Sequence, residues 1–282
     1  MEGLIIKNIS NDYVVSSNGR TYLCKPRGKF RYHGLSPLVG DVVDFDDKEK
    51  YLLKIHERKN CLVRPSVVNV DQAIIVASVK NPDLDTYLLD KLLTVVSYHR
   101  ISPIICFTKL DLLDSDEKEK LKNYISYYQK QGYSVVTNQN IDKFSALLEE
   151  KITVLAGQSG AGKSSLLNRI SPELNLKTNE ISYALNRGKH TTRHTELYSV
   201  LGGYVVDTPG FSSVDFRGME KISIRDNMNE MFRYLEYCKY RDCMHIKEDG
   251  CFVKHLVEKG EILKSRYENY LHFILEKEEE KR

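Results

Sequence analysis

Hydrophobic residues in the first 65 positions recur in short stretches that alternate with polar residues, which is the pattern of strands in a small sheet. The stretches cover residues 4–6, 12–15, 21–24, 41–45 and 51–55. Five short strands of this kind suit a closed β-barrel of the OB type. We therefore predict an N-terminal barrel domain over residues 1–65.

Apolar runs further along the chain are followed by polar loops. Strands are predicted at residues 103–107, 151–156 and 203–206, and a helix at residues 164–170 follows the second of them. Buried strands that lead into loops and helices are typical of an α/β domain with a mainly parallel sheet. This domain is expected to cover residues 66–215.

Beyond residue 215 the apolar positions follow helical spacing, over residues 219–237 and 254–281. The stripe in the second stretch comprises Leu256, Ile262, Leu263, Tyr267, Tyr270, Leu271 and Ile274. Such a stripe is most simply the face that a helix buries in a core. We predict a helical C-terminal domain over residues 216–282, with charged residues 276–282 at a frayed end.

The composition is that of an intracellular protein of two or three domains. A chain of 282 residues exceeds one typical domain. No apolar run approaches the roughly 20 residues needed to cross a bilayer, and the first residues lack a secretory signal. We expect a cytoplasmic monomer with no membrane partner. The net charge of +3 is too small to argue by itself for a nucleic-acid partner.

Cysteine spacing indicates a metal site. Three of the six cysteines are scattered, and the other three gather with one histidine as Cys238-x₄-Cys243-x-His245-x₅-Cys251. Three thiolates and an imidazole form the ligand set of a structural Zn²⁺ site, with no position left open for catalysis. The alternative is a set of reduced core cysteines beside a surface histidine. We predict one zinc ion that supports folding.

A phosphate-binding loop links the strand at residues 151–156 to the helix at 164–170. Its residues are Gly157, Gln158, Ser159, Gly160, Ala161, Gly162, Lys163 and Ser164, and Ser165 extends the predicted nucleotide contacts into the helix. Glycines let backbone N–H groups face phosphate oxygens, and the helix N-terminus favours an anion. The Lys163 ammonium can reach the outer phosphates, and the Ser164 hydroxyl can bind Mg²⁺.

A second motif, Thr108-Lys109-Leu110-Asp111, stands at the end of the strand at residues 103–107. It resembles the Asn-Lys-x-Asp guanine motif of GTPases. In that motif the aspartate accepts two hydrogen bonds from the guanine edge, and adenine lacks this donor pair. Asp111 is therefore the predicted guanine reader. Lys109 would cover the base with its aliphatic stem, and Thr108 takes the place of the usual asparagine.

Two further segments resemble GTPase switches. Asp207-Thr208-Pro209-Gly210 looks like the start of switch II, where Asp207 would hold Mg²⁺ through water and the Gly210 N–H would contact the γ-phosphate. The basic segment 186–194 is placed like switch I, and Thr192 or its neighbour Thr191 would complete the Mg²⁺ shell. A solvated basic loop is the alternative for this segment. Because residues 207–210 lead into the C-terminal domain, their movement offers a way to reorient that domain.

The order of these motifs, with the guanine motif ahead of the phosphate loop, resembles the circularly permuted GTPases. The flanking sequences narrow the resemblance to the ribosome small subunit-dependent GTPase A (RsgA) family and extend it over nearly the whole chain. They are Val39-Gly40-Asp41-Val42-Val43, Val68-Asn69-Val70-Asp71-Gln72, Arg187-Gly188-Lys189-His190-Thr191-Thr192, Asp207-Thr208-Pro209-Gly210-Phe211 and the Cys/His cluster. Departures from the family pattern are Thr108, Thr137-Asn138 in place of a Ser-Ala base contact, and Asp249 in place of a proline.

The resemblance also implies which residue acts in hydrolysis. Phe211 stands where Ras-like GTPases carry a water-orienting glutamine, and a phenyl ring cannot hydrogen-bond to water, so intrinsic hydrolysis should be slow. The family points to His190 as the residue that positions the attacking water once a partner orders the loop. An exposed histidine with no catalytic role is the alternative.

An RNA-binding surface is expected on the barrel. Between Tyr13 and Gly40 the chain has no acidic residue, and basic residues alternate there with aromatic ones. The predicted RNA-binding residues are Arg20, Lys25, Arg27, Lys29 and Arg31. Basic and aromatic side chains suit a phosphate backbone with unstacked bases, and the alternative is a solvated charged face.

Together, the residues predict an α/β protein with an OB-type barrel, a permuted GTPase domain and a zinc domain, and with Mg²⁺ accompanying GTP or GDP. The resemblance implies a GTP-hydrolysing factor that acts in late maturation of the small (30S) ribosomal subunit, binds its rRNA, and is stimulated by that subunit. A second reading is a GTP-gated RNA-binding switch with negligible hydrolysis. A third, a P-loop ATPase or small-molecule kinase, is disfavoured by Asp111.

Overall fold

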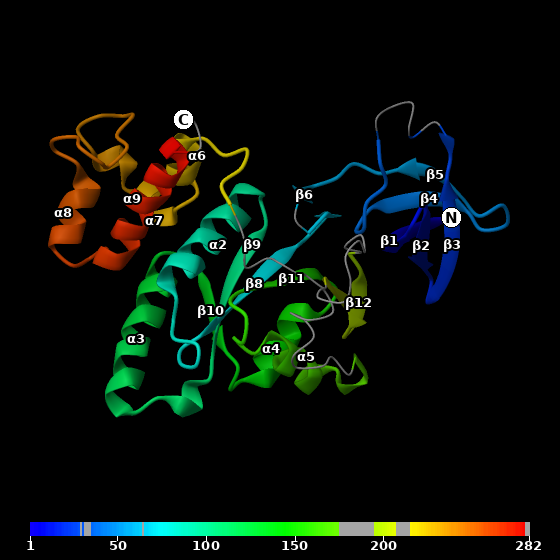
Figure 1. Ribbon diagram of the computed structural model, residues 1–282, viewed down its shortest axis with the longest axis horizontal. Helices are drawn as coiled ribbons and strands as arrows, with labels where there is room; N and C mark the ends of the chain where they lie inside the picture. Colours follow the sequence, from blue (N-terminus) through cyan, green and yellow to red (C-terminus); the bar gives the residue numbers. More distant parts are fainter. Residues whose placement is uncertain (29, 31–34, 64, 175–194, 207–214, 280–282) are drawn as a thin grey trace. The chain divides into compact units, whose positions relative to one another are not determined.

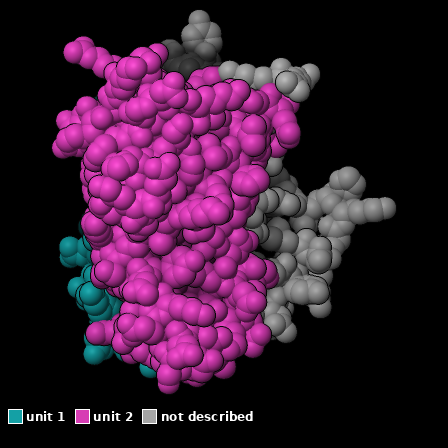
Figure 2. Space-filling model, turned by 90° about the vertical axis from the view of Figure 1, so that its left-hand side faces the viewer, with its two compact units in different colours: residues 1–73, 141–155, 163–211 teal, residues 74–140, 156–162, 212–282 magenta. Residues whose placement is uncertain are grey.

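The fold was analysed in a computed structural model, which describes residues 1–28, 30, 35–63, 65–174, 195–206 and 215–279 (Figure 1). The chain divides into two compact units, coloured in Figure 2. One unit combines residues 1–73, 141–155 and 163–211, and the other combines residues 74–140, 156–162 and 212–282. The limits of the three domains predicted from the sequence stay a prediction.

The N-terminal strands close into a barrel, which confirms the sequence prediction. Strands β1 (Glu2–Ile9), β2 (Asp12–Ser17), β3 (Arg20–Pro26), β4 (Val42–Asp46) and β5 (Tyr51–Ile55) follow the order β1-β2-β3-β5-β4 around it. Strand β1 pairs antiparallel with both β2 and β4, while β3 and β5 run parallel. Alternate residues of these strands fill the interior, among them Ile5, Val15, Cys24, Phe45 and Leu52, which are fully buried.

The Gly40-Asp41 pair of the first family motif has a structural role in the barrel. Gly40 has φ +91°, and a Cβ there would lie 2.1 Å from the Val68 carbonyl oxygen, so a larger residue would not fit. The buried Asp41 carboxylate accepts hydrogen bonds from Arg58 Nε at 2.7 Å, Arg58 Nη2 at 2.8 Å and Leu38 N at 2.7 Å. This motif therefore holds the chain on both sides of strands β4 and β5.

The segment after the barrel joins it to the central sheet. Strands β6 (Cys61–Leu62) and β7 (Val67–Val68) form a short hairpin. The Asn69 amide donates to the Gly40 carbonyl at 2.9 Å, and the Asp71 carboxylate accepts from Ile152 N at 2.7 Å. The second family motif thus connects the barrel to the strand that precedes the phosphate loop.

The central sheet has six strands in the order β10-β9-β8-β11-β13-β12. Their bounds are β8 (Gln72–Ser78), β9 (Ser102–Thr108), β10 (Ser134–Thr137), β11 (Ile152–Ala156), β12 (Leu197–Val200) and β13 (Gly203–Val206). The pairs β9/β10 and β11/β13 are parallel, and β12 pairs antiparallel with β13. Every residue of β8 is buried, as expected for a strand covered on both faces. The predicted α/β class with a mainly parallel sheet is confirmed.

Helices follow the strands, and side chains cap the starts of two of them. They are α2 (Thr86–Tyr98), α3 (Ser115–Lys130), α4 (Ile141–Leu148) and α5 (Lys163–Ile170), with short 3₁₀ turns at Leu110–Leu112 and Pro172–Leu174. Asp85 caps α2 by accepting from Leu88 N at 2.9 Å. Asp114 and Glu117 form a reciprocal capping box at the start of α3. No helix in the described ranges is long and apolar enough to cross a membrane.

The C-terminal region is helical, as predicted, but α6, α7 and α8 are short. The first stretch contains α6 (Lys221–Asp226), α7 (Asn229–Arg233) and the 3₁₀ turn Leu235–Tyr237, and the second contains α8 (Phe252–Glu258) and α9 (Lys264–Glu279). Gly260, with φ +73°, lies between the last two helices. The predicted stripe is confirmed in part, because Leu256, Ile262, Tyr270 and Ile274 are buried in one core.

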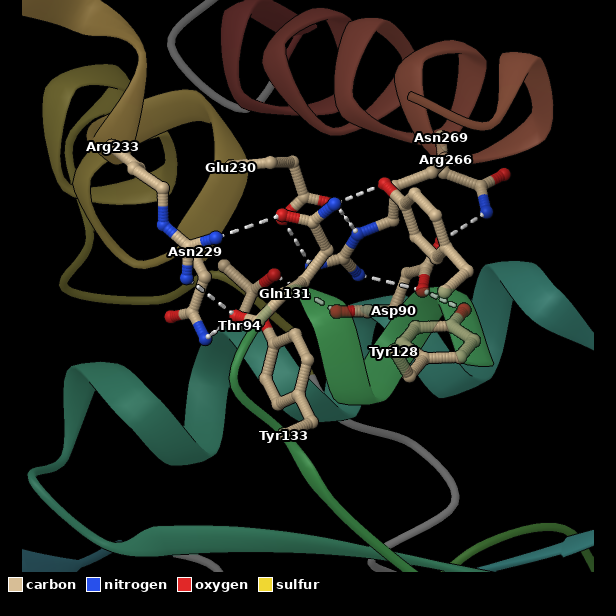
Figure 3. Close-up of polar contacts among 11 residues, drawn as sticks. Asp90, Thr94, Tyr128, Gln131, Tyr133, Asn229, Glu230, Arg233, Arg266 and Asn269 are labelled. Carbon is tan, nitrogen blue, oxygen red and sulfur yellow. Dashed lines mark hydrogen bonds and ion pairs between the residues drawn. The ribbon is translucent and has the colours of Figure 1, made fainter. Parts of the chain in front are cut away.

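A fully buried charge network ties α9 to the sheet's helices (Figure 3). Arg266 on α9 bonds through Nη1 to Asp90 Oδ1 on α2 at 2.6 Å, and through Nε to Glu230 Oε1 on α7 at 2.7 Å. Its Nη2 donates to the Tyr133 hydroxyl at 2.9 Å. One cation thus serves two carboxylates, and no side chain of this trio is more than 1% exposed.

Neutral donors add further hydrogen bonds to the two carboxylates. Asn269 Nδ2 donates to Asp90 Oδ2 at 2.6 Å, and the Tyr128 hydroxyl donates to Asp90 Oδ1 at 2.7 Å. The Tyr127 hydroxyl donates to Glu230 Oε1 at 2.7 Å. Because burial of a charge is costly unless its hydrogen bonds are complete, these donors are needed to keep the network stable.

Replacing Arg266 with methionine is expected to lower the free energy of unfolding by roughly 3–5 kcal/mol, because two buried carboxylates would lose their cation. Urea denaturation followed by circular dichroism measures the change. Lys122→Ala, which removes the exposed Lys122–Glu119 pair, is the matched control and should leave the midpoint nearly unchanged. An equally small effect for both variants would show that the network does not hold the C-terminal helices.

Candidate functional site

The phosphate loop has the strand, loop and helix context that the sequence predicted. Strand β11 ends at Ala156, and α5 begins at Lys163, so the first N–H groups of this helix adjoin the loop. Gly157 has φ +124°, and a Cβ there would lie 2.1 Å from the Val76 carbonyl oxygen of β8. The first glycine of the motif is therefore fixed by its close approach to the neighbouring strand.

Burial affects the lysine of the loop. It lowers the pKa of the Lys163 ammonium to about 8, because the low-dielectric surroundings disfavour the charge. A phosphate oxygen beside the ammonium would oppose this effect by attracting the positive charge. Ser164, the next residue, is also buried. Both side chains lie at the start of α5, where the sequence predicts contacts to phosphate and Mg²⁺.

Thr108 connects the guanine motif to the phosphate loop. It is the last residue of β9, it is buried, and its hydroxyl donates to the Ala161 carbonyl oxygen at 2.7 Å. The shorter threonine side chain in place of asparagine therefore still links the two motifs. This contact brings together two segments that are 53 positions apart in the sequence.

The rest of the guanine motif lies on a tight turn at the same strand end. Lys109 has φ +62°, and its ammonium donates to the Asn81 carbonyl oxygen after β8. Asp111 is exposed on the 3₁₀ turn Leu110–Leu112. The Asn138 N–H donates to the Phe107 carbonyl at 3.1 Å, which places the Thr137-Asn138 departure at this edge as well. Open α/β sheets bind ligands at such an edge.

Some predicted site residues lie outside the described residues. These are His190, Thr191 and Thr192 of the predicted switch I, Asp207 and Gly210 of the predicted switch II, and Lys29 and Arg31 of the predicted RNA surface. Their assignments therefore stay predictions. Strand β13 ends at Val206, directly before Asp207.

The four predicted zinc ligands converge. One possible ligand atom from each of Cys238, Cys243, His245 and Cys251 lies within 4.8 Å of all the others. His245 Nδ1 is 3.3 Å from Cys251 Sγ and 3.6 Å from Cys238 Sγ. His245 Nε2 lies 3.0 Å from the Met231 carbonyl oxygen, so it carries the proton and donates there. The Nδ1 lone pair is then directed at the cysteines, as metal ligation requires.

The electrostatics of the cluster also fit a cation. Burial raises the pKa of the Cys243 thiol to about 12, so a thiolate at this position needs a compensating positive charge. Burial lowers the pKa of His245, which favours the neutral imidazole that binds metals. Three sulfurs and one nitrogen are the donor set of a closed Zn²⁺ site, and the residues therefore fit the predicted ion.

Two residues that the sequence analysis did not assign a role support this cluster. The Glu248 carboxylate accepts from Met244 N at 2.7 Å, Ile246 N at 2.8 Å and Lys247 N at 3.0 Å, which orders the loop around His245. The buried Arg225 donates to the Cys243 carbonyl at 3.3 Å. Position in the ligand loop could have indicated Glu248, but nothing local marked Arg225.

The predicted RNA-binding residues on β3 and just after it are exposed, namely Arg20, Lys25 and Arg27. Tyr22 is half-buried beneath the Lys50 ammonium, which lies 4.6 Å from the ring centroid. Phe30 is only 5% exposed. The basic side chains are thus available to a partner, whereas Phe30 does not offer a ring for base stacking.

Known proteins match the chain along its whole length. The RsgA N-terminal domain family matches residues 2–51, and the RsgA GTPase family matches residues 55–217. A protein of Oceanobacillus iheyensis named small ribosomal subunit biogenesis GTPase RsgA 2 is 48% identical, with 98% of this chain and 97% of the relative aligned. The RsgA of Geobacillus kaustophilus is 47% identical over 99% of this chain and 98% of its own length.

Solved structures agree with these relatives. The crystal structure of YloQ, described as a circularly permuted GTPase, superposes with a TM-score of 0.85 at 39% identity, covering 100% of this chain and 96% of YloQ. YjeQ from Thermotoga maritima superposes with a TM-score of 0.82 at 35% identity, covering 98% of both chains. The motif order, the barrel and the family matches lead to one conclusion: this chain belongs to the RsgA family of circularly permuted GTPases.

Proposed function

We propose that this protein hydrolyses GTP during late maturation of the small ribosomal subunit, and that the subunit stimulates its turnover. The observation that carries the proposal is the chain-long similarity to proteins named small ribosomal subunit biogenesis GTPases. Membership of a GTPase family does not favour a binding switch that lacks hydrolysis. In this proposal the protein acts in the cytoplasm. It acts there as a monomer that binds rRNA.

In this proposal the nucleotide lies along the edge formed by the phosphate loop and the guanine motif. Residues 157–162 would supply backbone N–H groups, Lys163 would bind the outer phosphates, and Asp111 would read guanine. Ser164, Thr192 and Asp207 would hold Mg²⁺, which neutralises phosphate charge when it is bound. The Thr108–Ala161 hydrogen bond supports this arrangement, because it fixes the loop relative to the base-reading turn.

Hydrolysis would depend on His190, since Phe211 cannot orient water. An ordered switch I would bring the imidazole to the attacking water, and binding of the subunit would supply that order. The exposed Arg20, Lys25 and Arg27 would bind rRNA phosphates from the barrel, and Lys29 and Arg31 would extend this surface.

We also propose that the Cys238, Cys243, His245 and Cys251 cluster holds one zinc ion. The convergence of the four donors and the Nε2–Met231 hydrogen bond support this proposal. All four coordination positions would come from the protein, so the ion would stabilise the C-terminal helices and take no part in hydrolysis.

The proposed function is tested by GTP turnover with isolated small or large ribosomal subunits at fixed salt. Wild-type protein should be stimulated by the small subunit alone, because this subunit is the proposed partner. His190→Ala should lose the stimulation and still bind GTP, while His194→Ala is the control from the same segment. Absent stimulation of the wild type would refute the proposal, whereas equal stimulation of His190→Ala would remove His190 from the mechanism.

Guanine reading by Asp111 predicts a change of base specificity. Asp111→Asn should weaken GTP binding by roughly 10²-fold, because two charge-assisted hydrogen bonds to the base are lost. Binding of xanthosine triphosphate should improve, since an amide can donate to the xanthine 2-carbonyl. Fluorescent-nucleotide titration measures both affinities, with Asp116→Asn on α3 as the exposed control. Unchanged GTP affinity in Asp111→Asn would exclude this role.

Zinc content tests the cysteine cluster. Purified protein should contain one zinc per chain, and Cys243→Ser should lose it together with part of the helical signal at 222 nm. Cys61→Ser, which alters an exposed cysteine outside the cluster, should keep the metal. Equal zinc content in both variants would contradict the assignment.

A further inference from the structure

A second group of metal-ligand side chains lies on the barrel, apart from the cysteine cluster and the nucleotide motifs. It consists of Glu2 on β1, Asp44 on β4 and His56, which directly follows β5. One nitrogen or oxygen atom from each residue lies within 4.8 Å of the other two. We propose that this triad binds a divalent first-row transition metal ion such as Zn²⁺ or Co²⁺.

The barrel itself places the two carboxylates together. Glu2 and Asp44 are direct partners in the antiparallel β1/β4 ladder. The neighbours of Asp44 in β4, Val43 and Phe45, are buried, while both acidic side chains are partly exposed, at 66% for Glu2 and 39% for Asp44. Like charges directly opposite each other in a ladder are destabilising, so this pair calls for a cation.

His56 lies beside the carboxylate pair. Its backbone N–H donates to the Val42 carbonyl at 2.9 Å, which fixes the residue against β4. Its Nε2 is 3.2 Å from Asp44 Oδ1 and 4.0 Å from Glu2 Oε2. For metal bonds of 2.0–2.2 Å, tetrahedral ligand atoms are separated by about 3.4 Å, so the donors need only small shifts to share one ion.

A second observation concerns the imidazole nitrogen. His56 Nε2 is shielded from solvent and makes no hydrogen bond of good geometry, although Asp44 is within ion-pair distance. An imidazole nitrogen that is shielded from solvent and faces two carboxylates is placed as metal coordination requires. Lys54 is the ladder partner of Asp44 on β5, and it is exposed.

The donor set defines the class of ion. One imidazole and two carboxylates carry a net charge of −2 when the imidazole is neutral, which a divalent cation balances. An imidazole ligand favours a transition metal over Mg²⁺ or Ca²⁺, which prefer oxygen. Three protein ligands leave a position for water. The ion would join β1, β4 and the chain after β5, and so would stabilise the closure of the barrel.

The test uses untagged, nucleotide-free protein whose cysteine cluster is loaded with Zn²⁺. Titration with Co²⁺, followed by calorimetry and by d–d absorption, should show one further bound equivalent, without the thiolate charge-transfer bands of a cysteine site. His56→Gln and Asp44→Asn should each weaken this binding at least tenfold. Asp47→Asn, an exposed acidic residue in the turn after β4, is the matched control and should bind like wild type.

Two results would overturn the proposal. The first is that wild-type protein binds no Co²⁺ beyond the cysteine cluster, which would leave the triad as an ordinary surface ion pair. Alternatively, His56→Gln could bind Co²⁺ as tightly as wild type, which would place the ion elsewhere. Circular dichroism and retained zinc in the cysteine cluster establish that each variant is folded, so a loss of Co²⁺ binding reports on the triad.

Discussion

The buried bond between Arg266 and the carboxylates of Asp90 and Glu230 is the constraint on which the C-terminal region depends. These groups come from α9, α2 and α7, and the tyrosines of α3 and of the turn before β10 complete their hydrogen bonds. Separating the helices would leave the charges of Arg266, Asp90 and Glu230 without their partners, and an unpaired charge in a low-dielectric interior is costly. The cysteine cluster, the helical core and α2 are therefore parts of one compact unit.

The buried network also limits how the C-terminal helices could move in response to a nucleotide. The sequence suggested that movement of residues 207–210 reorients the C-terminal domain. The network instead favours joint movement of α9 with α2 and α3, because reorientation alone would break buried ion pairs. Leu88 and Leu89 of α2 line a small hollow together with Gly157 and Gln158 of the phosphate loop. The start of helix α2 thus lines this hollow, and the helix carries Asp90 directly after Leu89.

Local patterns were enough to predict much of the fold and of the candidate site. Alternating residues predicted the barrel, and glycine spacing predicted the loop whose Gly157 must approach β8. Cysteine spacing predicted the cluster that the structure assembles. In each case the determining residues are close in the sequence, or their chemistry is distinctive.

Long-range contacts were beyond such patterns. Asp90 and Arg266 are 176 positions apart, and each resembles an ordinary surface residue in the sequence. Thr108 is a departure from the asparagine of the guanine motif, and its bond to Ala161, 53 positions away, was likewise not evident from the sequence. Phe30 is one of the aromatic residues that alternate with basic ones between Tyr13 and Gly40, but it is buried and is not available for stacking on RNA bases. Tertiary packing determines the roles of these residues, and the neighbouring sequence does not indicate that packing.

If this protein is a GTPase that acts on the small ribosomal subunit, as proposed, we expect it to bind that subunit in the GTP state and to leave it after hydrolysis. The most direct test of this expectation is co-sedimentation with purified small subunits in the presence of a non-hydrolysable GTP analogue or of GDP, at one salt concentration, since backbone contacts to RNA are salt-dependent. The account predicts that the protein pellets with the subunit in the GTP analogue and largely stays in the supernatant with GDP. Equal pelleting with both nucleotides, or none with either, would contradict it.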